Sequence, residues 1–210
     1  APADEGAVWD PSSPYAASKA AAEHLVRAWH KTYGLPTLTT FGANTYGPWQ
    51  QPEKLVPTMV GSALAGRPLP VYGDGQQVRA WLHVDDHVRA IAAVLTGGRA
   101  GGRYNVGGEA QTNLGVVHAI CAELDQRAPR STPWREAISH VTDRPGHDRR
   151  YAVDDGRLRR ELGWTPQVPF ARGLQDTVRW FVERQDWCRE RLSGRRGLAP
   201  SSAQLISAAS

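Results

Sequence analysis

The residues of this chain best suited to chemistry are Tyr15 and Lys19, which lie four positions apart in an Ala-rich segment. Alanine has the highest helix propensity, so the segment predicts a helix. Residues four apart on a helix share a face, with Cβ atoms about 5–6 Å apart. A lysine ammonium that close stabilises a phenolate over a phenol, so the pair could remove the proton of a sugar or alcohol hydroxyl. Exposed helices also give this spacing by chance, so the interpretation depends on the motifs that follow.

Capping and turn residues define the helix that would position this pair. Serines in the segment 10–14 can cap a helix, and Gly34 is typical of a helix C-terminus. We therefore predict a helix over residues 13–33. The segment 35–41, rich in β-branched residues, predicts a buried strand followed by a loop over 42–48. A helix followed by a short connection and a strand is half of a crossover unit in a parallel α/β sheet.

Helices and strands continue to alternate along the rest of the chain. Asp85 and Asp86 are expected to cap one of the helices. Residues 193–210 lack periodicity and predict a disordered tail. The other predicted elements are a helix over 55–64, strands over 69–72 and 78–84, a helix ending near 96, a strand over 103–106, and helices over 113–124, 154–162 and 170–191, with a polar loop over 142–149.

Composition excludes several classes of protein. The formal charge is +4, but no Lys/Arg cluster is interleaved with aromatic residues, so we expect no nucleic-acid partner. No apolar run approaches the roughly 20 residues that span a bilayer, so we expect no membrane insertion. Cys121 and Cys188 are too few for a disulfide framework, and no histidine or cysteine spacing predicts a metal site. We expect Cys121 to be buried on an apolar helical face, and Trp81, Tyr104 and Trp164 to be core residues. A reducing cytoplasm is the expected compartment.

Seven motifs occur in a fixed order along the chain. Tyr-x-x-x-Lys and Tyr-Gly-Pro are general markers, whereas Pro-Glu-Lys-Leu together with Arg-Pro-Gly-His-Asp-Arg-Arg-Tyr is far more specific. On these motifs the chain, from about residue 11 to 192, resembles the C-terminal part of the dTDP-glucose 4,6-dehydratases, which are extended short-chain dehydrogenases/reductases. The motifs are Tyr15–Lys19, Asn44–Pro48, Pro52–Leu55, Leu69–Gly73, Arg79–His87, Tyr104–Gly108 and Asp143–Tyr151.

The resemblance implies a fold, a cofactor and a reaction. It implies a partial Rossmann-type parallel sheet over residues 1–50, a smaller α/β nucleotide-sugar-binding lobe with returning sheet elements over 51–192, and the tail over 193–210. In this family NAD transiently oxidises the sugar at C4, water leaves across C5 and C6, and the hydride returns to C6. Tyr15 would be the base at the C4 hydroxyl and Lys19 would bind the nicotinamide ribose, with Thr45 also near the cofactor.

The resemblance also implies a binding site for a dTDP-sugar. Cations and amide donors would hold its oxygen-rich diphosphate. Ordinary structural roles remain open for several of these residues: a strand-edge salt bridge to Asp85 or Asp86 for Arg79, a solvated loop for Arg144 and His147, and a helix N-cap for Asn113. The implied substrate-binding residues are Asn44, Lys54, Leu55, Pro70, Val71, Tyr72, Arg79, Asn113, Asp143, Arg144, Pro145, Gly146 and His147.

Three departures from the family pattern bear on activity. No glycine-rich phosphate-binding turn precedes Tyr15. Asp4 and Glu5 lie too close to Tyr15 to be the Asp-Glu pair that runs the elimination in relatives. Phe41 and Thr45 replace side chains that are polar, typically Asn, in relatives.

We therefore expect a truncated dehydratase that is poorly soluble and inactive by itself, and a homodimer at full length. Two alternatives remain open. One is another nucleotide-sugar short-chain dehydrogenase/reductase, such as an epimerase or decarboxylase, and the other is a non-catalytic nucleotide-sugar-binding fragment.

Overall fold

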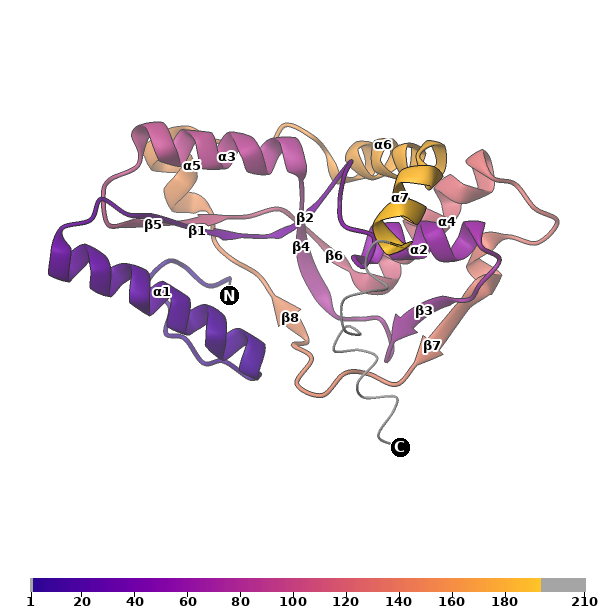
Figure 1. Ribbon diagram of the computed structural model, residues 1–210, viewed down its shortest axis with the longest axis horizontal. Helices are drawn as coiled ribbons and strands as arrows, with labels where there is room; N and C mark the ends of the chain where they lie inside the picture. The colour runs from indigo at the N-terminus through magenta and orange to yellow at the C-terminus, as the bar shows by residue number, and fades with distance from the viewer. Residues whose placement is uncertain (1, 194–210) are drawn as a thin grey trace.

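The computed structural model describes residues 2–193, which form an α/β fold with two halves joined through a central sheet (Figure 1). The expected α/β class is confirmed. In chain order the elements are α1 (Pro14–Tyr33), β1 (Leu38–Gly42), β2 (Asn44–Tyr46), α2 (Leu55–Leu64), β3 (Leu69–Tyr72), β4 (Val78–His83), α3 (Val84–Gly97), β5 (Gly102–Val106), β6 (Glu109–Thr112), α4 (Asn113–Arg127), the 3₁₀ helix η1 (Trp134–Ala137), β7 (Ile138–Val141), β8 (Arg150–Tyr151), α5 (Gly156–Leu162), α6 (Phe170–Glu183) and α7 (Gln185–Ser193).

The first half is a helix–sheet–helix sandwich. Strands β1 and β5 pair in parallel, with Leu38 opposite Gly102. Helix α1 lies on one face of this pair, and α3 and α5 lie on the other (Figure 1). The predicted caps of α1 are confirmed, because the Ser13 side chain accepts a hydrogen bond from the Ala16 amide and Gly34 ends the helix at a φ of 68°. A left-handed conformation favours glycine there.

In the second half, α2 and α4 pack against each other, α6 lies on both of them, and α7 packs on α6; α2 also contacts β3 of the parallel pair β3–β7 (Figure 1). Its core is the larger of two buried clusters and includes Val60, Ile120 and Leu174, each at most 1% exposed. Helix α6 supplies the most amphipathic face, with apolar residues buried at helical spacing. The smaller cluster lies in the first half, around Ala90, Tyr104 and others.

A mixed sheet connects the halves. Strand β4 pairs in parallel with β2 and β8 and antiparallel with β6. Gly108 precedes β6 and lies directly on the β4 backbone, since a Cβ atom there would be 2.3 Å from the Trp81 carbonyl oxygen. Only glycine permits this approach, which brings the turn after β5 back onto β4.

Two element predictions are wrong, and one strand, β6, was not predicted. The segment 42–48 is not all loop, because residues 44–46 pair with β4 as β2. The polar strand β6 has no hydrophobic alternation to mark it and forms because β4 offers it an antiparallel edge. The predicted helix over 170–191 is two helices, since Arg184 leaves helical geometry at φ −114° and ψ 40°.

Two predicted caps are also wrong. His83, not Asp85 or Asp86, is the N-cap of α3, and its ring accepts from the Asp85 amide. The N-cap of α4 is Thr112, so Asn113 is not explained as a cap. The predicted tail over 193–210 lies outside the described residues apart from Ser193, the last residue of α7.

Predictions of buried residues are confirmed. Trp81, Tyr104, Trp164 and Cys121 are all core residues.

None of the helices within residues 2–193 is long and apolar enough to cross a bilayer. Over the same residues, no group of three His, Cys, Asp or Glu side chains is placed to hold a metal ion.

Candidate functional site

A cavity of about 370 Å³ lies in the second half, between the central sheet, β3 and the helices α2 and α4. It collects side chains from segments that are far apart in sequence. Ten of the thirteen predicted substrate-binding residues line it: Asn44, Lys54, Leu55, Pro70, Val71, Tyr72, Arg79, Asn113, Arg144 and His147.

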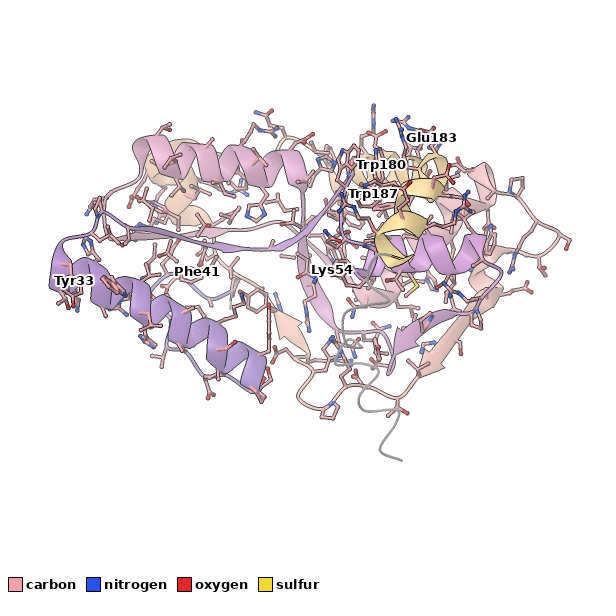
Figure 2. The ribbon with its side chains drawn as sticks, in the orientation of Figure 1. Tyr33, Phe41, Lys54, Trp180, Glu183 and Trp187 are labelled. Carbon is pink, nitrogen blue, oxygen red and sulfur yellow. The ribbon has the colours of Figure 1, made fainter. Side chains whose placement is uncertain are left out.

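The lining of the cavity has an apolar part and a charged part, in which Lys54, Arg79 and Arg144 outnumber Glu53. Met59, Trp81 and Val117 line it as parts of the buried core. Lys54 occupies the N-cap position of α2, but its side chain forms no capping bond there. Its position next to the central sheet is visible in Figure 2. A cavity with an apolar side and a few cations suits a ligand with one aromatic and one anionic part.

The loop between β7 and β8 places a connected polar group at the cavity. His147 Nδ1 lies 2.7 Å from Asp143 Oδ1, and Arg144 Nη2 lies 3.0 Å from His147 Nε2. Arginine can only donate, so Nε2 accepts and Nδ1 donates to the carboxylate. The hydrogen bond from His147 is the main reason that the pKa of Asp143 lies below its ordinary value. Asp143 therefore orients His147 and, through it, Arg144.

Arg144 and Arg79 are held by further contacts. The guanidinium of Arg144 lies 5.2 Å from the centre of the Tyr72 ring, within cation–π range. Arg79 donates to the carbonyl oxygens of Val78 and Asp148, at 2.8 and 2.6 Å. Burial lowers the pKa of Arg79, but arginine stays charged in proteins. The predicted alternative, a salt bridge of Arg79 to Asp85 or Asp86, is not formed; Asp86 pairs with Arg89 instead.

Three predicted substrate-binding residues do not line the cavity. Asp143 acts through His147 and also accepts from Gln77 Nε2 at 2.8 Å. Pro145 and Gly146 form the turn of the same loop. Gly146 has a φ of 67°, and a Cβ atom there would be 3.2 Å from the Ser12 carbonyl oxygen.

Tyr15 and Lys19 lie outside the cavity, on the first turns of α1. Tyr15 is 73% exposed, and Lys19 Nζ lies 5.6 Å from the centre of its ring. The start of α1 nevertheless touches the cavity's loop, because Ser12 Oγ donates to Asp148 Oδ1 at 3.0 Å. The structure therefore places the predicted base beside the cavity loop, with its ring open to solvent.

Thr45, on β2, is hydrogen-bonded to a residue of α3. Its hydroxyl is hydrogen-bonded to His87 Nδ1, and burial lowers the pKa of His87. Gly42 makes room for this imidazole, since a Cβ atom there would be 2.7 Å from His87 Cε1. Phe41, the other departure from the family pattern, packs edge-on against Trp9 at 5.2 Å and lies between α1 and the sheet (Figure 2).

Sequence reasoning missed part of the cavity. Trp81 was predicted to be only a core residue, yet it also lines the cavity, and its buried indole N–H has no hydrogen-bond partner in the described part of the chain. A buried donor without a partner is costly unless a ligand or water accepts from it. Thr58 and Met59, on the first turns of α2, also line the cavity, and the Pro-Glu-Lys-Leu motif just before them was the available signal.

A parallel α/β layer carrying a Tyr/Lys pair, joined to a lobe with a cationic cavity, defines a nucleotide-sugar short-chain dehydrogenase/reductase architecture. The family model for GDP-mannose 4,6 dehydratase matches residues 1–177. The chain belongs to this family.

Similarity to individual proteins is more specific than the match to the family model. The chain is 57% identical over 187 residues to the dTDP-glucose 4,6-dehydratase of Xanthomonas campestris pv. campestris, covering 88% of this chain and 53% of that protein. It is 52% identical over 191 residues to the enzyme of the same name from Salmonella typhimurium, covering 90% and 53%. DesIV, a dTDP-glucose 4,6-dehydratase from Streptomyces venezuelae solved with NAD and TYD bound, superposes with a TM-score of 0.85 at 46% identity, covering 91% and 57%. The chain therefore spans about half the length of the relatives it matches.

Proposed function

We propose that this chain carries the sugar-nucleotide-binding part and the Tyr/Lys base of a dTDP-glucose 4,6-dehydratase, a lyase that forms dTDP-4-keto-6-deoxyglucose. The cavity lined by ten predicted substrate-binding residues is the observation that carries the proposal. The relatives above, which bear this name, support it.

The cavity suits the two ends of such a substrate. Lys54, Arg79 and Arg144 would hold the diphosphate, because arginine and lysine supply charge-assisted hydrogen bonds to phosphate oxygens. The β3 residues Pro70–Tyr72 would contact the nucleoside. Asp143 would act as a positioning residue, since it touches the ligand side only through His147.

The catalytic proposal rests on α1. Tyr15 as phenolate would accept the proton of the sugar C4 hydroxyl, and the Lys19 ammonium would stabilise that phenolate. When bound, NAD supplies the chemistry of this family by taking a hydride from C4 and returning it to C6. The Tyr15 side chain is 73% exposed, which leaves it accessible to both groups.

The residues of this chain fit NAD only at one end. Tyr15 and Lys19 could bind the nicotinamide ribose, whereas the Thr45 hydroxyl is already taken by His87. No Gly-x-x-Gly-x-x-Gly turn occurs in the sequence to cradle a pyrophosphate. The residues of this chain would therefore contact NAD at the nicotinamide ribose alone.

A second function is binding without turnover. The cavity is formed wholly by residues of the described chain, whereas Tyr15 and Lys19 lie outside it. The chain could therefore bind a sugar nucleotide even when no cofactor lies beside the C4 hydroxyl of the sugar.

We also propose that two copies pair through α1, in a reducing cytoplasm that fits the two free thiols. Leu25, Trp29 and Tyr33 recur every fourth residue on α1 and are 61%, 53% and 69% exposed. An apolar stripe of this kind is typical of a helix that packs on another surface. Light scattering on the wild-type chain and on Leu25→Glu would test it: pairing predicts a dimer that the charge disrupts, and a monomeric wild type contradicts it.

Titration calorimetry with dTDP tests the binding proposal. Lys54→Gln removes an exposed cation of the cavity and should weaken binding about tenfold or more, since hydrogen bonds to charged groups contribute about 1.5–3 kcal/mol. The matched control is Arg67→Gln, an exposed cation outside the cavity. Equal affinity of the two variants, or no binding by the wild type, would contradict the proposal.

Turnover of dTDP-glucose with added NAD separates the two functions. A chain that acts as a lyase by itself would form 4-keto product and lose about 10²–10⁴-fold in Tyr15→Phe, the range attributed to general acid–base groups. A chain that is inactive by itself, as its sequence predicts, would form none. Tyr15→Phe should still bind dTDP normally. Normal dTDP binding with no product in the wild type would favour binding alone.

A further inference from the structure

A second cavity, of about 340 Å³, lies at the opposite end of the first half from the β7–β8 loop. It opens where the C-terminal turns of α1, the starts of β1 and β5, and α5 come together, at one end of the molecule in Figure 1. It shares no lining residue with the nucleotide-sugar cavity. Its charged lining residues are all basic: Arg27, Lys31, Arg99, Arg103 and Arg157, together with His30.

The carboxylates nearby are unevenly shared among these five cations. Glu23 is buried between Arg27 and Arg103, whose closest nitrogens lie 3.8 and 3.6 Å from its Oε1. Neither Glu23 oxygen receives a hydrogen bond within the described residues. Glu161 pairs with Arg157 at 3.0 Å. Two carboxylates thus pair with the five cations that line the cavity, and Asp4, Glu5 and Asp154 line a neighbouring pocket on the other side of Arg103 and Arg157. The positive charge is therefore least compensated at the Lys31 and Arg99 side of the cavity, and like charges held this close repel one another.

The two most exposed cations of the cavity are the least engaged. The Lys31 side chain has no ion pair or hydrogen bond among residues 2–193, and the Arg99 side chain acts on Glu161 only at long range. Thr37 and Thr39 also line the space. These groups supply donors on several sides of one opening, and few acceptors compete for them.

The loop before β5 is shaped to close against α1. Gly101 has a φ of 76°, and a Cβ atom there would be 2.4 Å from His30 Nε2. Glycine is therefore required both by the backbone conformation and by the contact. His30 is fixed in turn by a 2.7 Å hydrogen bond between its Nδ1 and the Leu35 carbonyl oxygen. The wall of the cavity is thus held in place independently of any ligand.

We propose that this cavity is a second anion site, which binds a small molecule carrying two adjacent phosphate groups. Guanidinium groups match phosphate oxygens with paired donors, and a bound anion would offset the positive charge of the lining. The site lies away from Tyr15 and from the nucleotide-sugar cavity, so its occupant is not the sugar nucleotide of the proposed reaction.

Calorimetric titration of the 210-residue chain with inorganic pyrophosphate at low salt tests this site. Lys31→Gln/Arg99→Gln removes its two unpaired cations and should weaken pyrophosphate binding at least tenfold. Two double variants are matched for charge. Lys54→Gln/Arg144→Gln removes cations of the nucleotide-sugar cavity, and Arg67→Gln/Arg184→Gln removes exposed cations from outside both cavities. Both should retain pyrophosphate binding at the second site.

The outcomes are separable. If the wild type does not bind pyrophosphate, or if Lys31→Gln/Arg99→Gln binds it as tightly as Arg67→Gln/Arg184→Gln, the site does not exist. If only Lys54→Gln/Arg144→Gln loses binding, pyrophosphate occupies the nucleotide-sugar cavity alone and the proposal is wrong. Because Lys31 and Arg99 are exposed, circular dichroism and the thermal midpoint should match the wild type. The dTDP titration is read separately, so failure of the proposed function leaves this test intact.

Discussion

Helices α1 and α6 show how differently the two halves are packed. Helix α6 buries Phe170, Leu174, Val178 and Phe181 in its 14 residues. Helix α1 has 20 residues and buries only Ala20 and Glu23. The second half thus obtains its core from the described chain itself, whereas α1 keeps most of its apolar side chains exposed. The nucleotide-sugar cavity belongs to the well-packed half, and the predicted base belongs to the other.

The largest expected effect breaks the packing of the second half. Leu174→Ala should lower the free energy of unfolding by about 2–5 kcal/mol, because Leu174 is 1% exposed and its loss leaves a cavity in the core. Leu95→Ala on α3, in the first half, is the matched control, because Leu95 is 73% exposed and lies outside the proposed pairing surface of α1. It should change stability by less than about 0.5 kcal/mol, as exposed substitutions usually do. Urea unfolding measures both, and similar losses would contradict the comparison.

The next effect concerns the connection between the halves. The Asp86 carboxylate is fully buried and accepts from the amides of Gln167 and Val168 at 2.8 and 2.9 Å, just before α6. It also pairs with Arg89. Asp86→Asn replaces one acceptor by a donor, so at least one of these amides loses its bond, at a cost of about 2–3 kcal/mol.

Asp85→Asn is the control for this junction. The Asp85 side chain is 69% exposed and lies 3.6 Å from the His83 ring. Its loss should cost no more than about 1 kcal/mol, the range of a charge in the first turn of a helix. If urea unfolding shows equal losses of stability for the two substitutions, the bonds from Asp86 to the Gln167 and Val168 amides do not stabilise the connection between α3 and α6.

Sequence reasoning succeeded where a local signal and the tertiary environment agreed. The Ala-rich run, Ser13 and Gly34 together set the bounds of α1 to within a residue. The motifs that carry the nucleotide-sugar cavity were also readable, because Lys54, Tyr72 and Arg79 each lie in a recognisable segment. Their convergence on one cavity depends on strand pairing that no segment encodes alone.

The failures have a common physical cause. Strands β2 and β6 form because β4 presents edges to them, although neither segment has a strand pattern. Trp81 carries enough apolar surface to be predicted as core, and only the fold reveals that the cavity reaches it. The basic cavity was invisible for the same reason, since its cations come from three separate segments.

A smaller effect concerns the loop that leads from the central sheet to Lys54. Trp49 has a φ of 66°, a left-handed conformation that costs a non-glycine residue about 1–2 kcal/mol. Its ring packs against Trp180 and Trp187, with centroids 4.9 and 5.6 Å away, and Figure 2 shows these two tryptophans side by side near α7. We infer that ring packing offsets the backbone cost.

Two substitutions at Trp49 separate the contribution of the ring packing from the cost of the left-handed backbone. Trp49→Ala and Trp49→Gly both remove the ring, but only glycine relieves the left-handed backbone. We expect Trp49→Gly to be the more stable by about 1 kcal/mol in urea unfolding. Equal stability would show that the backbone conformation carries no cost in this loop.

The smallest expected effect is a pH dependence centred on the first half. Burial lowers the pKa of His83 and of His87 below the ordinary value of 6.5. In the unfolded chain both rings gain protons as the pH falls through 6.5, while the folded chain resists protonation until a lower pH. The unfolded state then binds more protons, so stability should fall as the pH drops below 6.5.

The double variant His83→Asn/His87→Gln tests this assignment. Asparagine can still cap α3 and glutamine can still bond Thr45, so the fold should be retained. Urea unfolding at pH 7.5 and pH 5.5 should show a smaller loss of stability in the variant than in the wild type. If the variant loses as much stability between pH 7.5 and pH 5.5 as the wild type does, groups other than these two imidazoles cause the acid sensitivity.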